Sequence, residues 1–154
     1  LKTVALRFGN VYGPRSDHKS SVVAKFIRQA MEGKTCEIYG DGTQTRDFIY
    51  IDDLTEAILK AAETDIGGEA FQIATSKEHT VNEVAEMLKS QLSKNGIAME
   101  IKYGDARLGD VKRNFSDTTK ARIQLGWKAQ TELSVGLENA VHWFKDKNKA
   151  RQAL

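Results

Sequence analysis

The stretch LRFGNVYGPR, residues 6–15, places an apolar strand directly before an abrupt turn that holds the only proline of the chain. Val4, Leu6 and Phe8 occupy alternate positions, which predicts a buried β-strand over residues 1–8. No helix or loop introduces this strand, so we expect the chain to be one part of a longer protein, with an ordinary N-terminal edge strand as the alternative. Because such a strand on its own would expose an unpaired edge, we expect it to be disordered, repacked or paired with another chain.

Length and composition are those of one ordinary globular domain. The chain has 154 residues, of which 40% are hydrophobic and 29% charged, and a chain of this length buries about two thirds of the surface that its unfolded form exposes. Its 23 basic and 21 acidic residues are spread along the sequence, which argues against a dedicated nucleic-acid surface. No apolar run approaches the ~20 residues of a membrane span, and no secretory signal is recognisable. We therefore expect neither a nucleic acid nor a membrane as a partner.

Cysteine and histidine usage predicts neither a disulfide nor a metal site. Cys36 is the only cysteine, so no internal disulfide can form, and the cytoplasm is the expected location. We expect this residue to be buried in a strand or core rather than to act as a nucleophile. His18, His79 and His142 lie far apart, and none has a second histidine three or four positions away.

The rest of the sequence alternates predicted strands and helices. Apolar residues recur at helical spacing over residues 22–31 and stop at Gly33, while Thr80 and Glu83 form a capping box for a helix that ends at residues 95–96. Further strands are expected at 36–39, 46–51, 70–74 and 99–103, and further helices after residue 52, at 117–125 and at 133–144. Because the strands and helices follow no regular rhythm, we predict an α+β (mixed α/β) fold rather than a complete doubly wound sheet.

The junction of strand 46–51 with the following helix contains two adjacent carboxylates. Asp52 is expected to cap the helix, and together with Asp53 it is interpreted as an N-cap pair rather than as a set of metal ligands. The apolar face of this helix is predicted to carry Leu54, Ile58 and Ala61.

Two irregular segments combine glycine with arginine. Residues 39–48, YGDGTQTRDF, lie between two predicted strands and contain Arg46, and residues 107–110, RLGD, repeat the combination. Such segments are common as exposed turns. Alternatively, glycine allows the backbone to approach a ligand, and a guanidinium group can hold two phosphate oxygens at once. The residue pattern leaves both interpretations open.

Five motifs follow one another over residues 6–127, within a similarity that extends to about residue 144: LRFGNVYGPR, IYGDGTQTRDFIYIDDL, RLGDV, DTTKA and LGW. In this order and approximate spacing they resemble the extended short-chain dehydrogenase/reductase family, specifically its NAD-dependent sugar-nucleotide epimerases and dehydratases. Each motif alone is modest. Together, in the family's order, they are not expected by chance.

The resemblance implies a two-domain enzyme, in which an N-terminal Rossmann domain binds NAD and a C-terminal part binds a nucleoside-diphosphate sugar, such as a UDP- or TDP-sugar. Residues 1–15 correspond to the last strand and turn of the Rossmann domain, and residues 16–154 to the nucleotide-sugar-binding domain. The family's glycine-rich fingerprint and its catalytic Tyr-x-x-x-Lys motif are absent from this sequence. We therefore assign no catalytic residue and expect this chain alone to be inactive.

The resemblance also implies which residues form the site. Phe8, Gly9 and Val11 would lie beside the nicotinamide end of NAD, and residues 22–23 would close over the substrate. Gln72 stands where the family often has asparagine, so a substrate contact there is lost or reaches differently. The implied substrate-binding residues are Asn10, Val22, Val23, Glu37, Ile38, Tyr39, Arg46, Gln72, Arg107 and Asp110.

Each polar member of this set has an implied role. Arg46 and Arg107 match the two arginines that bind the diphosphate, and Asp110 matches an acid that contacts the nucleoside. Residues 37–39 match the strand edge along the base. Asn10 would donate or accept a hydrogen bond near the sugar and diphosphate, although it could instead stabilise the turn that follows it.

Three functions remain open at this stage. The first is the substrate-binding part of an NAD-dependent sugar-nucleotide 4-epimerase, whose complete form we expect to be a homodimer. The second is the same part of a 4,6-dehydratase or a decarboxylase. The third is a non-catalytic nucleotide-binding or interaction module. Of the aromatic residues Tyr39, Tyr50 and Trp127, all of which suit a core, only Tyr39 has a position that also favours a functional role.

Overall fold

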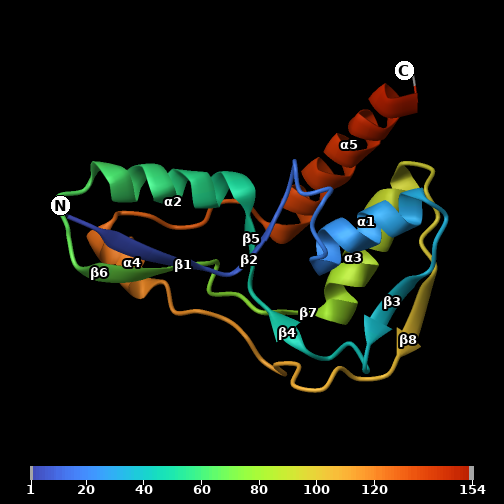
Figure 1. Ribbon diagram of the computed structural model, residues 1–154, viewed down its shortest axis with the longest axis horizontal. Coiled ribbons are helices and arrows are strands. Elements are labelled where there is room, and N and C mark those ends of the chain that lie inside the picture. The colour runs from blue at the N-terminus through green and yellow to red at the C-terminus, as the bar shows by residue number, and fades with distance from the viewer. Residues whose placement is uncertain (1, 153–154) are drawn as a thin grey trace.

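The computed structural model describes residues 2–152. Two groups of elements occupy the ends of an elongated molecule (Figure 1): β1, β6, α2 and α4 at one end, and α1, α3, β3 and β8 at the other. The elements in chain order are β1 (Val4–Phe8), β2 (Asn10–Tyr12), α1 (Val22–Met31), β3 (Cys36–Tyr39), β4 (Thr45–Arg46), β5 (Phe48–Tyr50), α2 (Ile51–Glu63), β6 (Glu69–Ile73), β7 (His79–Thr80), α3 (Val81–Lys94), β8 (Ile101–Gly104), α4 (Thr119–Gln124) and α5 (Leu133–Gln152).

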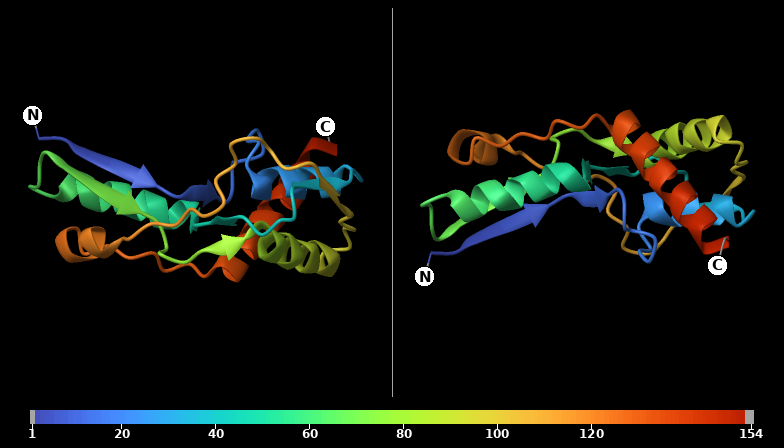
Figure 2. Two further views of the ribbon diagram at one scale, coloured as in Figure 1. Left: turned by 90° about the horizontal axis from the view of Figure 1, so that it is seen from below. Right: turned by 90° about the horizontal axis from the view of Figure 1, so that it is seen from above.

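The strands of the described residues pair two by two. β1 pairs with β6, β2 with β5 and β3 with β8, each in parallel, and β4 pairs with β7 in the antiparallel direction. Each parallel partner comes from a distant part of the sequence, and Figure 2 shows β1, in blue, beside the green segment that contains β6. The predicted mixed α/β fold class is confirmed.

Two hydrophobic clusters form the core, and the β2–β5 ladder lies between them. Ile49 of β5 and Val11 of β2 belong to the cluster formed with α2, α4 and β6. Phe48, Tyr50 and Tyr12, on the opposite face of the same ladder, belong to the larger cluster formed with α1, α3 and α5. This alternation follows from the two-residue period of a strand. Buried Tyr50 and Trp127 confirm the prediction that they are core aromatics.

Strand β1 differs from the sequence prediction in its surroundings. Val4 and Leu6 pack partly buried against the α2 cluster, as the alternation predicts, but Phe8 is 56% exposed and is not a buried position. The strand is ordered and pairs with β6 of the same chain, from Val4 opposite Glu69 to Phe8 opposite Ile73. The expectation of a disordered strand is therefore wrong, whereas the alternatives of a repacked strand or of one paired with another chain stay predictions. The proposed boundary at residue 15 stays a prediction, and β1 shares its cluster with later elements of this chain.

The helices on either side of the larger cluster match their sequence signals. Helix α1 ends where predicted, and Gly33 follows it in the left-handed conformation with φ 66°, which glycine adopts without strain. In α3 the Thr80 hydroxyl accepts the amide of Glu83, whose carboxylate accepts the amide of Thr80, so the capping box is confirmed. Buried Cys36 lies in β3, as expected of a strand residue.

Helix α2 corrects two predictions. It starts at Ile51 after Tyr50, so Asp52 and Asp53 lie in the first turn instead of capping the helix. Ile58, predicted on the apolar face, is 48% exposed, and Ala57 is buried instead. The predicted strand 46–51 is divided into β4 and β5 by Asp47, because the carbonyl and carboxylate groups of Asp47 bond to other segments.

Candidate functional site

A cavity of about 240 Å³ lies among α1, β2, β3 and the loop at residues 107–110, and we call it the α1–β3 cavity. Ten of the thirteen residues predicted from the sequence line it. They are Asn10, Val11, Val22, Val23, Glu37, Ile38, Tyr39, Arg46, Arg107 and Asp110. Residues from four distant parts of the sequence thus face one space, although their individual roles stay predictions.

Three predicted residues lie outside this lining. Phe8 is at the exposed end of β1, and Gln72 is in β6 opposite Arg7. Gly9 lies against the backbone between β4 and β5, where an added Cβ would come 2.8 Å from the main-chain oxygen of Asp47. The close approach of the Asp47 main chain therefore explains a glycine at position 9, and Gln72 lies outside the cavity lining.

Arg46 joins the two glycine–arginine segments. Its guanidinium donates to the Asp110 carboxylate at 2.5 Å and to the main-chain oxygens of Thr45 at 2.7 Å and Val111 at 2.5 Å. The side chain is 18% exposed, so it is held at the cavity wall with few alternative positions. Both interpretations of these segments hold in part, because the same contacts fix a turn and orient a forked cation.

Tyr39 lies against two further cations. The guanidinium carbon of Arg107 is 3.8 Å from the centre of the Tyr39 ring, and the Lys25 ammonium is 5.0 Å from it. Hydrogen bonding by Arg107, with added attraction from Lys25, lowers the pKa of the Tyr39 phenol below its ordinary value. The ring is therefore exposed to a positive field on a wall of the cavity.

The α1–β3 cavity carries an excess of positive charge. Lys25, Arg46 and Arg107 are its cations, and Glu37 and Asp110 are its acids. Glu37 pairs with Lys102 at 2.9 Å, which lowers the pKa of its carboxyl group, and Asp110 pairs with Arg46. Neither Lys25 nor Arg107 forms an ion pair with a carboxylate among the side chains of residues 2–150. Such a site favours an anionic ligand.

A second cavity, of about 390 Å³, adjoins the first. The two cavities share Tyr39, Gln44, Arg107 and Asp110, and Lys112 lines the second but not the first. A ligand with two chemically different parts could therefore occupy both spaces along one wall.

Two lining residues were not singled out from the sequence. Lys25 is three positions after Val22 on α1, so helical spacing places both on the same face, a signal that the sequence does contain. Gln44 lies in the 39–48 segment, and its side-chain amide donates to the main-chain oxygen of Tyr39 at 2.9 Å. Nothing in the local sequence separates Gln44 from its polar neighbours.

Metal sites and membrane spans are two other features that the described residues lack. Among the described residues, no group of three histidine, cysteine, aspartate or glutamate side chains is arranged to hold a metal ion. No helix in the described part of the chain has the length and apolar composition needed to cross a membrane.

Comparisons with known proteins point to one family. The model of the NAD dependent epimerase/dehydratase family matches residues 1–74. A UDP-glucose 4-epimerase of Mycolicibacterium smegmatis is 35% identical over 142 residues, a match that covers 91% of this chain and 44% of that protein. UDP-glucuronic acid decarboxylase 1 of Xenopus tropicalis is 30% identical over 140 residues, covering 90% of this chain and 32% of that protein.

A solved structure agrees in fold. The crystal structure of a UDP-glucose 4-epimerase of Thermotoga maritima with UDP-glucose superimposes with a TM-score of 0.88 at 38% identity, covering 96% of this chain and 47% of that one. The chain spans less than half the length of these relatives. From the family match, the relatives and the shared fold, the chain belongs to the NAD-dependent epimerase/dehydratase family.

Proposed function

We propose that the α1–β3 cavity binds a nucleoside-diphosphate sugar, and that this chain is the substrate-binding part of an NAD-dependent sugar-nucleotide 4-epimerase. The observation that carries the proposal is the convergence of Lys25, Arg46, Arg107 and Asn10 on one cavity. A diphosphate needs several cations at once, and an exposed turn would not require them to face the same space.

The geometry supports an assignment of different cavity residues to different parts of the ligand. Arg46 is fixed by Asp110 and two carbonyl groups, so it is oriented before a ligand arrives, whereas Arg107 rests on the Tyr39 ring. We assign the diphosphate to these two arginines and the base to the edge of β3. Contacts to the remote nucleotide would then hold the sugar in position for reaction, which is how binding energy contributes to rate.

NAD would supply the hydride acceptor and donor for a reaction at the sugar's C4 atom. Of the residues assigned to a nicotinamide site, Val11 lines the α1–β3 cavity and would form an apolar wall of that site, whereas Phe8 has an exposed ring and Gly9 packs against the Asp47 main chain, both outside the cavity lining. This chain's contribution would be to place the sugar against that wall. The residues that bind the rest of NAD, and the acid/base pair, would belong to a Rossmann domain outside this sequence.

A second candidate keeps the same site but changes the reaction. The similarity to a UDP-glucuronic acid decarboxylase favours a decarboxylase or dehydratase as the alternative, and the diphosphate and base contacts assigned above would serve any of these reactions. A non-catalytic nucleotide-binding module is the third candidate, and an encoded Rossmann segment with Tyr-x-x-x-Lys would argue against it. A cytoplasmic location, a homodimeric complete enzyme and the use of TDP-sugars also stay predictions.

Calorimetric titration of UDP into the chain tests the proposed site. We expect measurable binding, and Arg46→Ala should weaken it about 10- to 100-fold, since a charge-assisted hydrogen bond contributes roughly 1.5–3 kcal/mol. Arg122→Ala is the matched control, because Arg122 is an exposed arginine on α4 outside the cavity lining. Equal affinities in the two variants, or no UDP binding by the unaltered chain, would overturn the assignment.

A further inference from the structure

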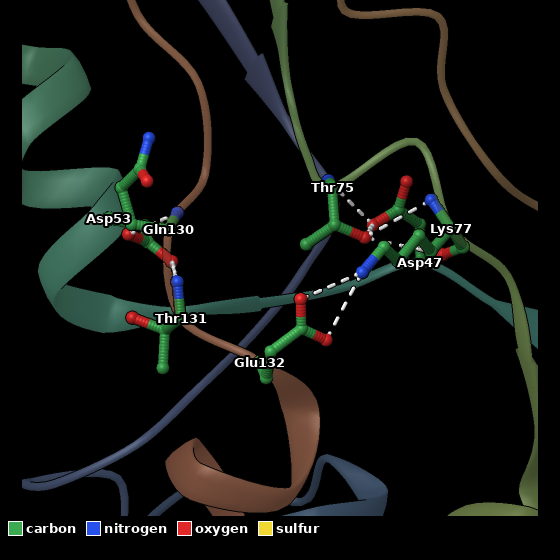
Figure 3. Close-up of polar contacts among 7 residues, drawn as sticks. All are labelled: Asp47, Asp53, Thr75, Lys77, Gln130, Thr131 and Glu132. Atoms are coloured by element: carbon green, nitrogen blue, oxygen red, sulfur yellow. Dashed lines mark hydrogen bonds and ion pairs between the residues drawn. The ribbon is translucent and has the colours of Figure 1, made fainter.

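Asp47 is a fully buried carboxylate that gathers distant segments beside the cavity. One of its oxygens accepts the Thr75 amide at 2.9 Å and the Thr75 hydroxyl at 2.6 Å, and the other accepts the amides of Ser76 at 2.9 Å and Ser116 at 3.5 Å. Figure 3 shows the Asp47 and Thr75 side chains pointing toward each other. A buried charge of this kind is stable only when such donors surround it.

The main chain of Asp47 extends this network to the α1–β3 cavity. Its carbonyl oxygen accepts the Asn10 amide at 2.7 Å and the Asn10 side-chain nitrogen at 3.4 Å. Its two neighbours in sequence, Arg46 and Phe48, both line the cavity. Any shift of Asp47 is therefore passed to Asn10 on one side and to Arg46 on the other.

We propose that Asp47 is a positioning residue, which sets Asn10 and Arg46 for ligand binding by anchoring the backbone between β4 and β5. The identity of the ligand in this proposal rests on the proposed function. The anchoring of the backbone by Asp47 does not, because it is a property of the chain without ligand. An asparagine at this position could not accept all four hydrogen bonds. Its NH₂ group would replace one carboxylate oxygen, and as a donor it cannot accept from the donors on that side.

Asp53 provides a matched comparison within the same molecule. Its buried carboxylate, 4% exposed, accepts the amides of Gln130 and Thr131, both at 3.0 Å (Figure 3). Its carbonyl oxygen accepts the Trp127 indole N–H. It therefore also ties down a distant segment. Asp47 adjoins two residues that line the α1–β3 cavity, whereas Asp53 adjoins none.

The test compares Asp47→Asn with Asp53→Asn. Both should lower the melting temperature, and UDP affinity is measured by calorimetry at a temperature where each variant is folded. We expect Asp47→Asn to weaken UDP binding on the order of tenfold, as a displaced binding group would, and Asp53→Asn to leave it unchanged. In ¹⁵N-resolved NMR spectra without ligand, only Asp47→Asn should move the Asn10 side-chain amide and Arg46 Nε–H signals.

Each outcome decides the proposal. If the unaltered chain does not bind UDP, the proposed function fails, and the NMR comparison alone decides the positioning role. Unmoved Asn10 and Arg46 signals in Asp47→Asn, or equal losses of affinity in the two aspartate variants, would overturn it. Should Asp47→Asn fail to fold, Thr75→Val removes one donor to the same carboxylate, with Thr75→Ser as the hydroxyl-retaining control. Thr75→Val should weaken UDP binding and shift the same signals in the same direction, and Thr75→Ser should restore both.

Discussion

A single phenol ring links the two cavities of the candidate site. Tyr39 is on the wall shared by both, and the two cations against it belong to a helix and to a loop that are distant in sequence. The lowered pKa of its phenol is therefore a reporter of whether Arg107 and Lys25 stay in place.

This reporter leads to a prediction for the titration of tyrosine. In the spectrophotometric titration of phenolate, Tyr39 should ionise below its ordinary pKa of 10.0, whereas burial raises the pKa of Tyr50. Between the lowered pKa and about 10, the unfolded chain binds more protons at Tyr39, so the contribution of Tyr39 to stability rises with pH in that window. The difference spectrum of the chain minus Tyr39→Phe should show this early component.

Arg107→Ala is the internal check on the cause. Removing this guanidinium should move the early component toward higher pH without abolishing it. A Tyr39 component that titrates at the same pH in both proteins would contradict the assigned cause.

The sequence predicts most of the residues that line the cavity, but it does not predict the hydrogen bonds that hold those residues in place. Arg46 and Arg107 are recognisable because their motifs are continuous in sequence. Asp47 adjoins Arg46 in the same motif, yet its role depends on Thr75, Ser76 and Ser116, whose approach no local pattern encodes. Gln72 lies outside the cavity lining, which shows that a family position alone does not place a side chain in the cavity, and its substrate contact stays a prediction.

Among the elements, helix α3 has the most complete sequence signal. Its capping box satisfies two groups that would otherwise lack partners at the helix start, and Val84, Leu88 and Leu92 on its buried face are fully covered. The register of this helix follows from local chemistry alone, which is why the sequence predicts it well.

Replacing the cap should have a measurable cost. Thr80→Ala should lower the free energy of unfolding by about 1 kcal/mol, since alanine cannot accept the Glu83 amide. Ser90→Ala, at an exposed position of the same helix, should not destabilise the chain, because alanine is the better helix former. Urea denaturation measures both effects, provided that the dependence of the unfolding free energy on urea concentration is the same in each variant. Equal midpoints for the two variants would count against the capping role.

The start of α2 shows where local signals fail. Asp52 has the residue type of an N-cap, but the helix begins at Ile51, with Tyr50 at the cap position. The Asp53 carboxylate accepts the amides of Gln130 and Thr131 instead. A carboxylate at a helix start has two possible uses, and only the position of residues 130–131 decides between them.

For the molecule as a whole, the pairing of β1 matters most. Among the described strands it pairs only with β6, and Ala5, Arg7 and Phe8 are exposed. In a parallel ladder, a strand with one neighbour leaves alternate amide groups on its other edge without a partner.

Hydrogen exchange should detect this free edge. Across residues 4–8, we expect protected amides to alternate with amides that exchange almost as fast as in an unfolded chain, whereas Val84 and Leu88 in α3 should be uniformly protected. Uniform protection of β1 would contradict the single pairing. A dilution series would then show whether a second copy of the chain covers that edge.

The β2–β5 ladder, with Ile49 on one face and Phe48 and Tyr50 on the other, has a consequence for cooperativity. A shift of this three-residue register by one position would turn the side chains of both hydrophobic clusters toward the wrong partner at the same time. Neither end of the molecule can then reach its native packing while the other is misaligned. The elongated chain should behave as one folding unit, because its two halves depend on the same six residues being correctly aligned.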